Sequence, residues 1–218
     1  MARARGAGAL TANAARTVRI GLTGPIGCGK SQVARWLGEA GARVVDADLV
    51  AREVTAPGQP IHDQVLRRFG RPVTAADGTL DRAALGRLVF ADPAALRDLE
   101  ALVHPAVRPR ILDEIAAAEG AGAPAVAIEA IKLVEGGLAA LCDEVWLVTC
   151  DEDAQRERLA GRGLARRDAE QRMAAQEGLA DRLRPLATRV VDTSGDAARS
   201  RERVLAAFAA ATAADRRS

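Results

Sequence analysis

Aromatic residues are scarce in this chain. Tyrosine is absent, and phenylalanine and tryptophan together make up 2% of the 218 residues. Proteins that hold single-stranded nucleic acid stack its bases on aromatic rings, so this composition argues against such a ligand. The 31 basic and 29 acidic residues leave a net charge of only +2, too weak a field for a typical nucleic-acid-binding surface. We therefore expect no nucleic-acid partner.

Long apolar runs are also missing. No stretch approaches the roughly 20 apolar residues that span a bilayer, and we expect no membrane association. Residues 1–16 lack the apolar centre of a secretory signal. They contain Arg3, Arg5 and Arg16 but no acidic residue, as a mitochondrial presequence would. Because the segment is short and not clearly amphipathic, we interpret it as a disordered tail.

Cysteines are few and widely separated. Cys28, Cys142 and Cys150 form an odd-numbered set whose spacing fits neither a disulfide framework nor a metal-ligand motif. This pattern is typical of a protein kept in a reducing compartment. We therefore expect no structural disulfides and a cytoplasmic location.

What the sequence does contain is a regular alternation of short β-branched runs with long helix-compatible stretches. The runs are expected to form five strands, near residues 17–23, 43–46, 125–128, 145–149 and 189–191. Such alternation predicts a parallel sheet covered by helices on both faces, an α/β fold of three layers. A chain of this length, 49% apolar, can bury one substantial core and carry an inserted subdomain.

The positions of proline, glycine and arginine along the chain suggest how this unit is divided. We expect a tail at 1–16, a main domain at 17–200, and a closing helix and tail at 201–218, with the helix beginning near Ala197. Within the main domain, we expect a helical insertion for a second substrate at about 51–123 and a mobile Arg-rich lid at about 155–184. No internal repeat is present, and the chain is expected to be a monomer or a small homo-oligomer.

The segment from Gly24 to Ser31 fits the pattern G-x-x-x-x-G-K-[ST], between an expected strand and an expected helix. Its glycines, at positions 24, 27 and 29, let backbone N–H groups turn inward around phosphate oxygens. Lys30 would reach the terminal phosphates and Ser31 would ligate Mg²⁺. Cys28 is interpreted as a small side chain that fits this loop rather than as a reactive thiol. The motif predicts binding of ATP with Mg²⁺.

Lysine use supports this interpretation independently. Lys30 and Lys132 are the only two lysines among the 31 basic residues, and arginine stands everywhere else. An ammonium is a compact point charge, whereas a guanidinium is a broad planar fork. A tight phosphate cradle would reject the arginine that the rest of the chain accepts, so Lys30 is predicted to be chemically constrained.

Two carboxylates, Asp46 and Asp48, follow the second expected strand. They would lie at the carboxyl edge of the parallel sheet, where ligands of open α/β folds bind. One of them could orient or deprotonate an attacking hydroxyl. Alternatively, an aspartate placed before Leu49 is a good helix N-cap. Spacing alone does not separate the two roles.

Other polar residues have both a chemical and a structural interpretation. Glu129 ends the third expected strand, where a magnesium-linked carboxylate or a surface turn would fit. His104 precedes Pro105 at an expected helix start, where it would contact a substrate or serve only structure. The possible lid is rich in arginine, with Arg156, Arg158, Arg162, Arg166, Arg167 and Arg172. These could form a solvated face, but guanidinium groups also stabilise a transferring phosphoryl group. We favour Arg158 and Arg162, which are four residues apart on one helix face.

Taken together, these residues resemble the dephospho-CoA kinase family over nearly the whole span from Ile20 to Gly195. The motifs occur in the same order as in that family: Ile20 to Ser31, Val45 to Arg52, Phe69-Gly70, Asp77 to Arg82, Val89 to Pro93, Leu102 to Pro105, Arg158 to Arg162 and Arg172 to Gln176. The resemblance implies a three-layer P-loop kinase fold with a five-stranded parallel sheet, a helical acceptor insertion and an Arg-rich lid. It also implies transfer of the γ-phosphate of ATP to the ribose 3′-hydroxyl of dephospho-CoA, giving CoA and ADP.

The resemblance also implies residue roles. Asp48 becomes the expected base, with Lys30 and Arg158 as further catalytic residues. The ATP loop would run from Gly27 to Gln32, and Arg162 would also contact the donor. The expected acceptor residues are Thr23, Asp48, His104, Glu129 and Lys132.

The chain departs from the family pattern in several places. The segment from Glu129 to Glu135 usually begins with Asp and continues through Pro-Leu-Leu, so Lys132 is an added charge that would pair with Glu129 or approach a phosphate. Gln32 replaces a frequent Thr, Gly163 replaces an acid of the lid, and Thr193 stands where Asn is common.

Two other functions are compatible with the phosphate loop alone. A different small-molecule or nucleoside-monophosphate kinase would not need the combination of Asp46-Ala47-Asp48 with His104-Pro105. A GTPase switch would carry an Asn-Lys-x-Asp motif, and none is present.

Overall fold

A computed structural model describes residues 16–214. The expected tail lies outside this range except for Arg16, whose guanidinium donates to the Asp143 carboxylate at 2.5 Å. The chain forms a five-stranded, all-parallel sheet in the order β2-β3-β1-β4-β5. The strands are β1 (Val18–Thr23), β2 (Arg43–Asp46), β3 (Ala125–Glu129), β4 (Glu144–Thr149) and β5 (Arg189–Asp192). The predicted α/β fold is therefore confirmed.

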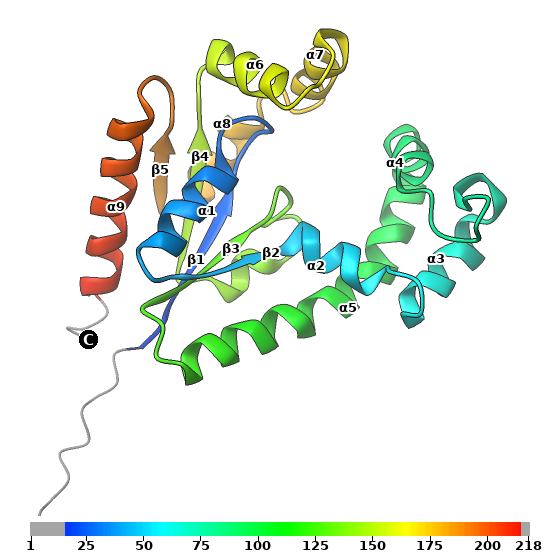
Figure 1. Ribbon diagram of the computed structural model, residues 1–218, viewed down its shortest axis with the longest axis horizontal. Helices are drawn as coiled ribbons and strands as arrows, with labels where there is room; N and C mark the ends of the chain where they lie inside the picture. Colours follow the sequence, from blue (N-terminus) through cyan, green and yellow to red (C-terminus); the bar gives the residue numbers. More distant parts are fainter. Residues whose placement is uncertain (1–15, 215–218) are drawn as a thin grey trace, which may run out of the picture.

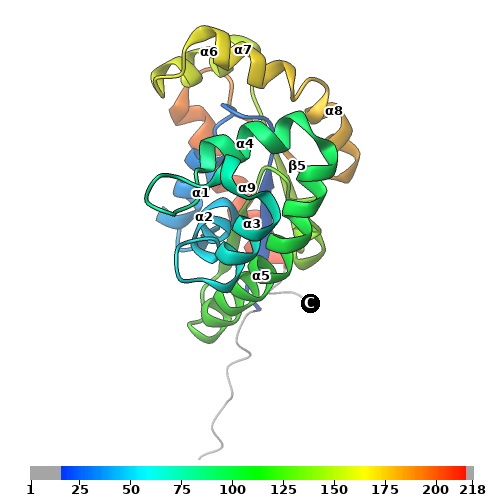
Figure 2. The ribbon, with the colours of Figure 1, turned by 90° about the vertical axis from the view of Figure 1, so that its right-hand side faces the viewer.

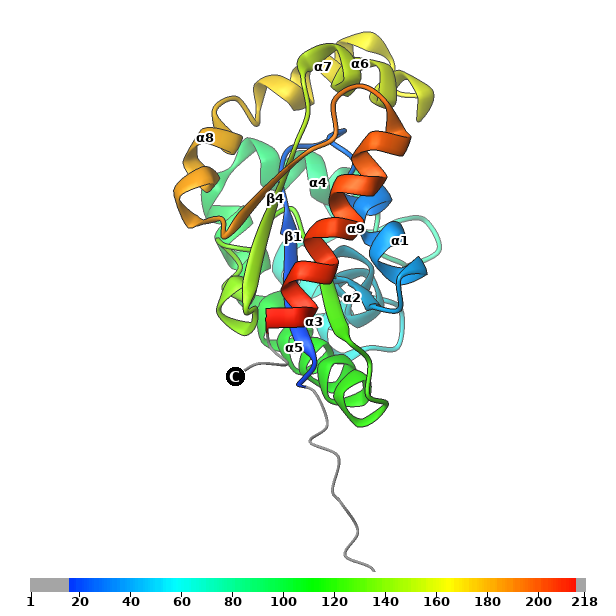
Figure 3. The ribbon, with the colours of Figure 1, turned by 90° about the vertical axis from the view of Figure 1, so that its left-hand side faces the viewer.

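Helices cover both faces of the sheet (Figures 1 and 3). The first face packs against α1 (Lys30–Glu39) and α9 (Ala197–Ala214), and the second against α2 (Ala47–Val54) and α5 (Pro93–Gly120). Alternate strand residues point to opposite faces. The first core accordingly contains Ile20, Leu22, Trp146 and Val148. The second contains Val45, Val126, Ile128 and Val145.

Two of the helices between β2 and β3, α3 (Pro60–Phe69) and α4 (Arg82–Ala91), form an arm beside the sheet (Figures 1 and 2). The short 3₁₀ helix η1 (Arg71–Val73) also belongs to the arm. The arm has a separate apolar core, which consists of Val65, Phe69, Val73, Leu85, Val89 and Ala95. Helices α3 and α4 each pack against α5, which therefore connects the arm to the main sheet.

Helix α5 corrects one expectation. The His104-Pro105 pair was interpreted as a helix start, but both residues lie inside this 28-residue helix, which also contains Pro109. A proline in a helix lacks the N–H for one backbone hydrogen bond. Burial of a regular apolar face outweighs this loss here. That face comprises Val103, Val107, Ile111 and Ile115.

The segment expected to form a lid lies over the carboxyl ends of the strands (Figure 1). It contains α6 (Glu152–Gly161), α7 (Arg166–Ala174), α8 (Leu179–Leu183) and the 3₁₀ helix η3 (Arg184–Leu186). Leu179 and Leu183 pack on Leu147 of β4, so the end of the segment is anchored to the sheet. A further 3₁₀ helix, η2 (Leu138–Leu141), precedes β4. Within the described part of the chain, none of the helices has the length and apolarity needed to cross a bilayer.

Candidate active site

The loop between β1 and α1 turns tightly under the lid. Gly24, Gly27 and Gly29 all have positive φ angles, of 139°, 79° and 86°, which a residue with a side chain rarely adopts. A Cβ atom at Gly24 would lie 2.1 Å from the carbonyl oxygen of Val148, so the neighbouring strand also excludes a side chain there. The motif therefore requires glycine for two reasons: the positive φ angles, and the lack of room for a Cβ atom at Gly24.

Lys30 points back into this loop. Its Nζ donates hydrogen bonds to the carbonyl oxygens of Gly24, at 2.8 Å, and Pro25, at 3.0 Å. The residue is only 7% exposed. Burial lowers the pKa of Lys30 to about 8, although the Glu129 and Asp48 carboxylates oppose the shift. An ammonium that is tied to loop carbonyls is positioned to exchange these contacts for phosphate oxygens.

Two amide side chains from the lid segment hold the loop in place. The Ile26 N–H donates to Gln176 Oε1 at 2.7 Å, and the Ile26 carbonyl accepts from Gln155 Nε2 at 2.6 Å. Gln155 is buried. Sequence reasoning gave neither glutamine a role of its own, because a single amide in an Arg-rich helix carries no distinguishing signal. The phosphate loop is thus hydrogen-bonded to α6 and to the turn that follows α7.

Ser31 and Glu129 bring two oxygen ligands together. The Ser31 hydroxyl donates to Glu129 Oε1 at 2.7 Å. Desolvation raises the pKa of Glu129, against the hydrogen bond from Ser31. Mg²⁺ prefers oxygen ligands and is commonly held by one or two side chains together with substrate phosphates. This pair fits such an ion, whereas the described residues contain no group of three or more His, Cys, Asp or Glu that could hold a metal alone.

The structure separates the two aspartates after β2. Asp46 caps α2, because its Oδ1 accepts from the N–H groups of Asp48, at 2.9 Å, and Leu49, at 3.0 Å. Asp48 lies in the first turn of that helix, and its carboxylate interacts with Lys30. Desolvation, followed by the charge of Asp46, raises the pKa of Asp48. One aspartate therefore has the structural role and the other stands beside the phosphate loop.

Thr23 lies at the end of β1 and is fully buried. Its hydroxyl donates to the carbonyl oxygen of Ile131 at 3.1 Å, in the loop that follows β3. Thr23 thus holds the segment that was expected to contact an acceptor. In this conformation its own hydroxyl points to the protein backbone.

One of the two expectations for the second lysine is wrong. Lys132 pairs with Glu100 of α5, not with Glu129, and both side chains are partly exposed. His104 lies one helical turn after Glu100, and its imidazole approaches Gly136, where a Cβ atom would be 3.7 Å from the ring. The loop after β3 and helix α5 therefore meet through Lys132, Glu100 and His104. Glu100 was missed because an acidic residue on a long helix has no distinctive pattern.

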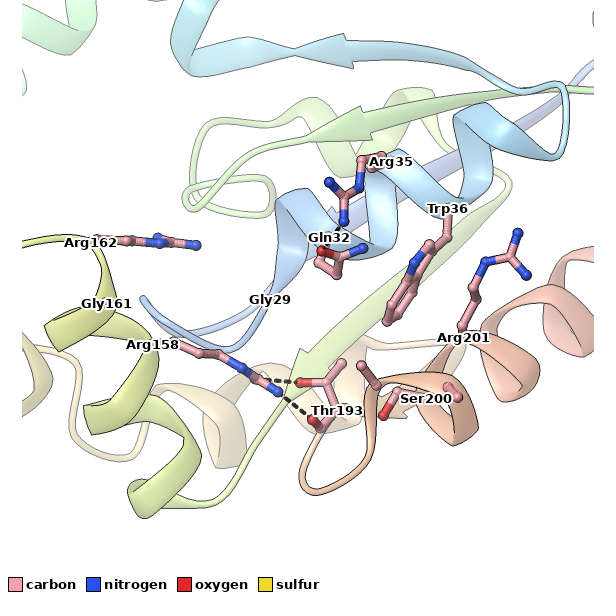
Figure 4. A pocket seen from close by; sticks show the side chains of 12 residues that line it. Gly29, Gln32, Arg35, Trp36, Arg158, Gly161, Arg162, Thr193, Ser200 and Arg201 are labelled. Atoms are coloured by element: carbon pink, nitrogen blue, oxygen red, sulfur yellow. Dashed lines mark hydrogen bonds between the residues drawn. The ribbon is translucent and has the colours of Figure 1, made fainter.

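A cavity of about 550 Å³ opens between α1, the end of α6 and the start of α9 (Figure 4). Arg158 and Arg162 lie on one side of it, and Gln32, Arg35 and Trp36 on the other. Arg162 follows the last residue of α6, so the expected pair straddles the helix end. The Arg158 guanidinium donates to the hydroxyl and carbonyl oxygens of Thr193, at 2.9 and 2.6 Å. Sequence reasoning assigned no site role to Arg35, Trp36 or Thr193.

The cysteines correct another expectation. Cys28 and Cys150 form a disulfide, although they are 122 residues apart in sequence. Strands β1 and β4 are neighbours in the sheet, so the loop after the first lies beside the end of the second. Spacing along the chain could not show this proximity. Cys142 is a free thiol, and burial raises its pKa to about 12.

Comparisons with known proteins give one consistent result. The sequence profile of the family described as dephospho-CoA kinase matches residues 18–199. A protein of that name from Symbiobacterium thermophilum is 46% identical over 193 residues, covering 88% of this chain and 80% of the relative. Another from Geobacter metallireducens is 44% identical over 188 residues, covering 86% and 93%.

Solved structures share the fold of this chain. The protein TT1252 from Thermus thermophilus superposes with a TM-score of 0.76 at 36% identity, covering 89% of this chain and 97% of that one. The dephospho-CoA kinase from Campylobacter jejuni shares the fold, with a TM-score of 0.65 at 20% identity, covering 90% and 98%. With a matching profile over most of its length and relatives at this identity, the chain belongs to the dephospho-CoA kinase family.

Proposed function

We propose that this protein transfers the γ-phosphate of ATP to the ribose 3′-hydroxyl of dephospho-CoA, giving CoA and ADP. The main observation behind the proposal is that the two aspartates after β2 have different roles. The side chain of Asp46 caps α2, whereas the Asp48 carboxylate does not cap the helix and interacts electrostatically with Lys30. A carboxylate next to a phosphate-binding lysine is what a kinase needs to orient a hydroxyl toward the transferred group.

The donor would lie between the phosphate loop and α6. Backbone N–H groups from Gly27 to Gln32 would surround the phosphates at the start of α1, where the helix dipole adds positive charge. Lys30 would exchange its bonds with the loop carbonyls for phosphate oxygens. The cavity bordered by Gln32 and Trp36 is large enough for the nucleoside part of ATP. Arg158 and Arg162, at the edge of this cavity, would place guanidinium groups against the transferring phosphoryl group.

Ser31 and Glu129 would hold Mg²⁺, Ser31 by its hydroxyl and Glu129 directly or through water. The ion would supply positive charge to the phosphates during transfer. In this role, Glu129 serves the donor side as well as the predicted acceptor side.

The acceptor would enter from the arm. The predicted acceptor residues Thr23, His104, Glu129 and Lys132 lie on, or support, the loop after β3 and the adjoining part of α5. The arm formed by α3 and α4 would cover the rest of the bound dephospho-CoA. Asp48 would accept the proton of the attacking hydroxyl. We further propose that the enzyme works in the cytoplasm as a monomer or a small homo-oligomer, with residues 51–123 as the acceptor insertion and 155–184 as the lid.

The test is a coupled assay with purified protein, ATP, Mg²⁺ and dephospho-CoA. CoA and ADP should appear in equal amounts, and omission of Mg²⁺ should abolish the reaction. Nucleoside monophosphates and shikimate serve as competing acceptors and should be used poorly. ADP formation that is independent of any acceptor would contradict the proposal, as would faster turnover of another acceptor.

A further inference from the structure

The Cys28–Cys150 disulfide joins two parts of the donor site. Cys28 is the fifth residue of the phosphate loop and is 1% exposed. Cys150 lies directly after β4 and directly before Asp151, which caps α6 by accepting from the Ala154 N–H. The bond therefore connects the phosphate loop covalently to the base of the helix that carries Arg158.

The same two parts are also connected without the disulfide. The Thr193 hydroxyl donates to the Cys28 carbonyl at 2.8 Å and accepts from Arg158. Gln155 of α6 bonds to Ile26 of the loop. Three hydrogen bonds therefore also connect the loop with α6, and reduction of the disulfide removes none of their donors or acceptors.

We propose that Cys28 and Cys150 are a redox-modification site that switches the kinase off when the disulfide forms. This inference rests on the proposed function and cytoplasmic location. Disulfides of cytosolic proteins are usually transient and redox-sensing, because the compartment keeps thiols reduced. The reaction partners are low-molecular-weight thiols and their disulfides. In the off direction, the two protein thiols are oxidised to one disulfide, and one small disulfide is reduced to two thiols.

Exposure decides which sulfur reacts first on reduction. Cys28 is buried, whereas Cys150 is partly exposed. An incoming small thiolate therefore attacks the Cys150 sulfur, forms a mixed disulfide there and releases the Cys28 thiolate, which takes up a proton. A second small thiolate then attacks the mixed disulfide, which releases the Cys150 thiol and a small-molecule disulfide.

The location explains why oxidation lowers activity. Transfer requires the loop to close around the phosphates while Arg158 leaves Thr193 and turns toward the transferring group. The disulfide holds the loop to the base of α6, so neither part adjusts independently. In the oxidised state that the structure represents, Arg158 remains bonded to Thr193. Small errors of position at a reacting centre are costly, and we expect kcat/KM for ATP to fall by at least about tenfold.

The experiment compares the full-length enzyme after reduction with tris(2-carboxyethyl)phosphine and after oxidation with glutathione disulfide, each freed of reagent. Dephospho-CoA carries a thiol that would reduce the site, so the assay uses S-methyl dephospho-CoA. Thiol counting on the denatured protein should give three thiols after reduction and one after oxidation. Turnover should fall on oxidation and return on reduction. Equal turnover of two forms with these thiol counts would overturn the inference.

Two variants give matched controls. Cys150→Ser lies outside the catalytic machinery, and it should keep the activity of the reduced enzyme and lose the response to oxidation. Cys142→Ser removes the free thiol and should keep the full response. A response that persists in Cys150→Ser, or disappears in Cys142→Ser, would overturn the assignment. Absence of kinase activity in the fully reduced enzyme would instead contradict the proposed function, so the two failures are distinguishable.

Discussion

Two loops meet at the carboxyl edge of the sheet, and each contains one of the chain's two lysines. The loop after β1 buries Lys30 and bonds it to its own carbonyl oxygens. The loop after β3 leaves Lys132 half exposed and pairs it with Glu100 of another element. The first lysine is fixed by a closed backbone turn, whereas the second depends on a side chain. The two loops therefore differ in how much of the geometry of their lysine the backbone supplies.

The largest effect should follow substitution in the first loop. Lys30→Arg places a wider, planar group in a nearly closed space, and kcat should fall by about 10³-fold. Steady-state kinetics with saturating ATP and dephospho-CoA measure the loss. Lys132→Arg is the matched control and should keep kcat within about threefold, because an exposed ion pair contributes little. Similar losses in the two variants would remove the distinction between the loops.

The next effect concerns the carboxylate beside the two loops. Asp48→Asn should lower kcat by about 10²-fold while ATP affinity is maintained, because the amide cannot accept the hydroxyl's proton. Calorimetric ATP titration and initial rates separate the two quantities. Asp46→Asn is the control: asparagine also caps helices, so turnover should stay near the wild-type value. A larger loss in Asp46→Asn than in Asp48→Asn would reverse the assignment.

The pH dependence gives a smaller effect that reports on both groups. The pKa of Lys30 is about 8 because the side chain is buried, so the ammonium loses its proton as pH rises through that value. The value of kcat/KM for ATP should therefore fall on the alkaline side, with a slope that approaches about tenfold per pH unit. On the acid side, the raised pKa of Asp48 should place the descending limb above the usual aspartate range.

A pH profile of kcat/KM between about pH 5 and 10 measures both limbs. Asp48→Asn should remove the contribution of Asp48 to the acid limb, leaving that of Glu129, whose pKa is also raised by burial, and should leave the alkaline limb unchanged. An alkaline limb near the pKa of an ordinary exposed lysine would show that Lys30 is not desolvated in solution.

The smallest expected effect is on KM for dephospho-CoA and comes from substitutions at the ion pair of the loop after β3. Lys132→Met and Glu100→Gln should each raise KM for dephospho-CoA by about fivefold or less, with KM for ATP unchanged, since the pair is partly exposed. If the two residues act together, the double variant should be no worse than either single variant. Additive losses would indicate that each side chain contacts the acceptor separately.

How much could be predicted from sequence differs between these regions. The turn of the glycine loop between β1 and α1 could be predicted, because its local motif records the backbone angles. The five strands could also be located, since short β-branched runs mark strands of a parallel sheet that is buried on both faces. In contrast, spacing alone left a catalytic role and a helix-capping role open for Asp46 and Asp48, and only the hydrogen bonds from the Asp48 and Leu49 N–H groups show that Asp46 is the cap.

Long-range contacts account for what sequence reasoning missed. The Cys28–Cys150 bond, the Lys132–Glu100 pair and the two glutamines on Ile26 join segments that the sheet order brings together. Contacts between distant segments produce no periodic pattern in a single sequence. The helix through Pro105 was missed for another reason: a local helix-breaking signal was overridden by burial of the α5 face.

The separate core of the arm has an evolutionary consequence. Val65, Phe69 and Leu85 pack with one another and not with the sheet, so substitutions among them leave the phosphate loop's support untouched. Residues of the arm's core can therefore vary in evolution more independently of the loop after β1 than residues of the sheet can. The arm is thus the part of the molecule whose shape can change with the least effect on the loop that contains Lys30.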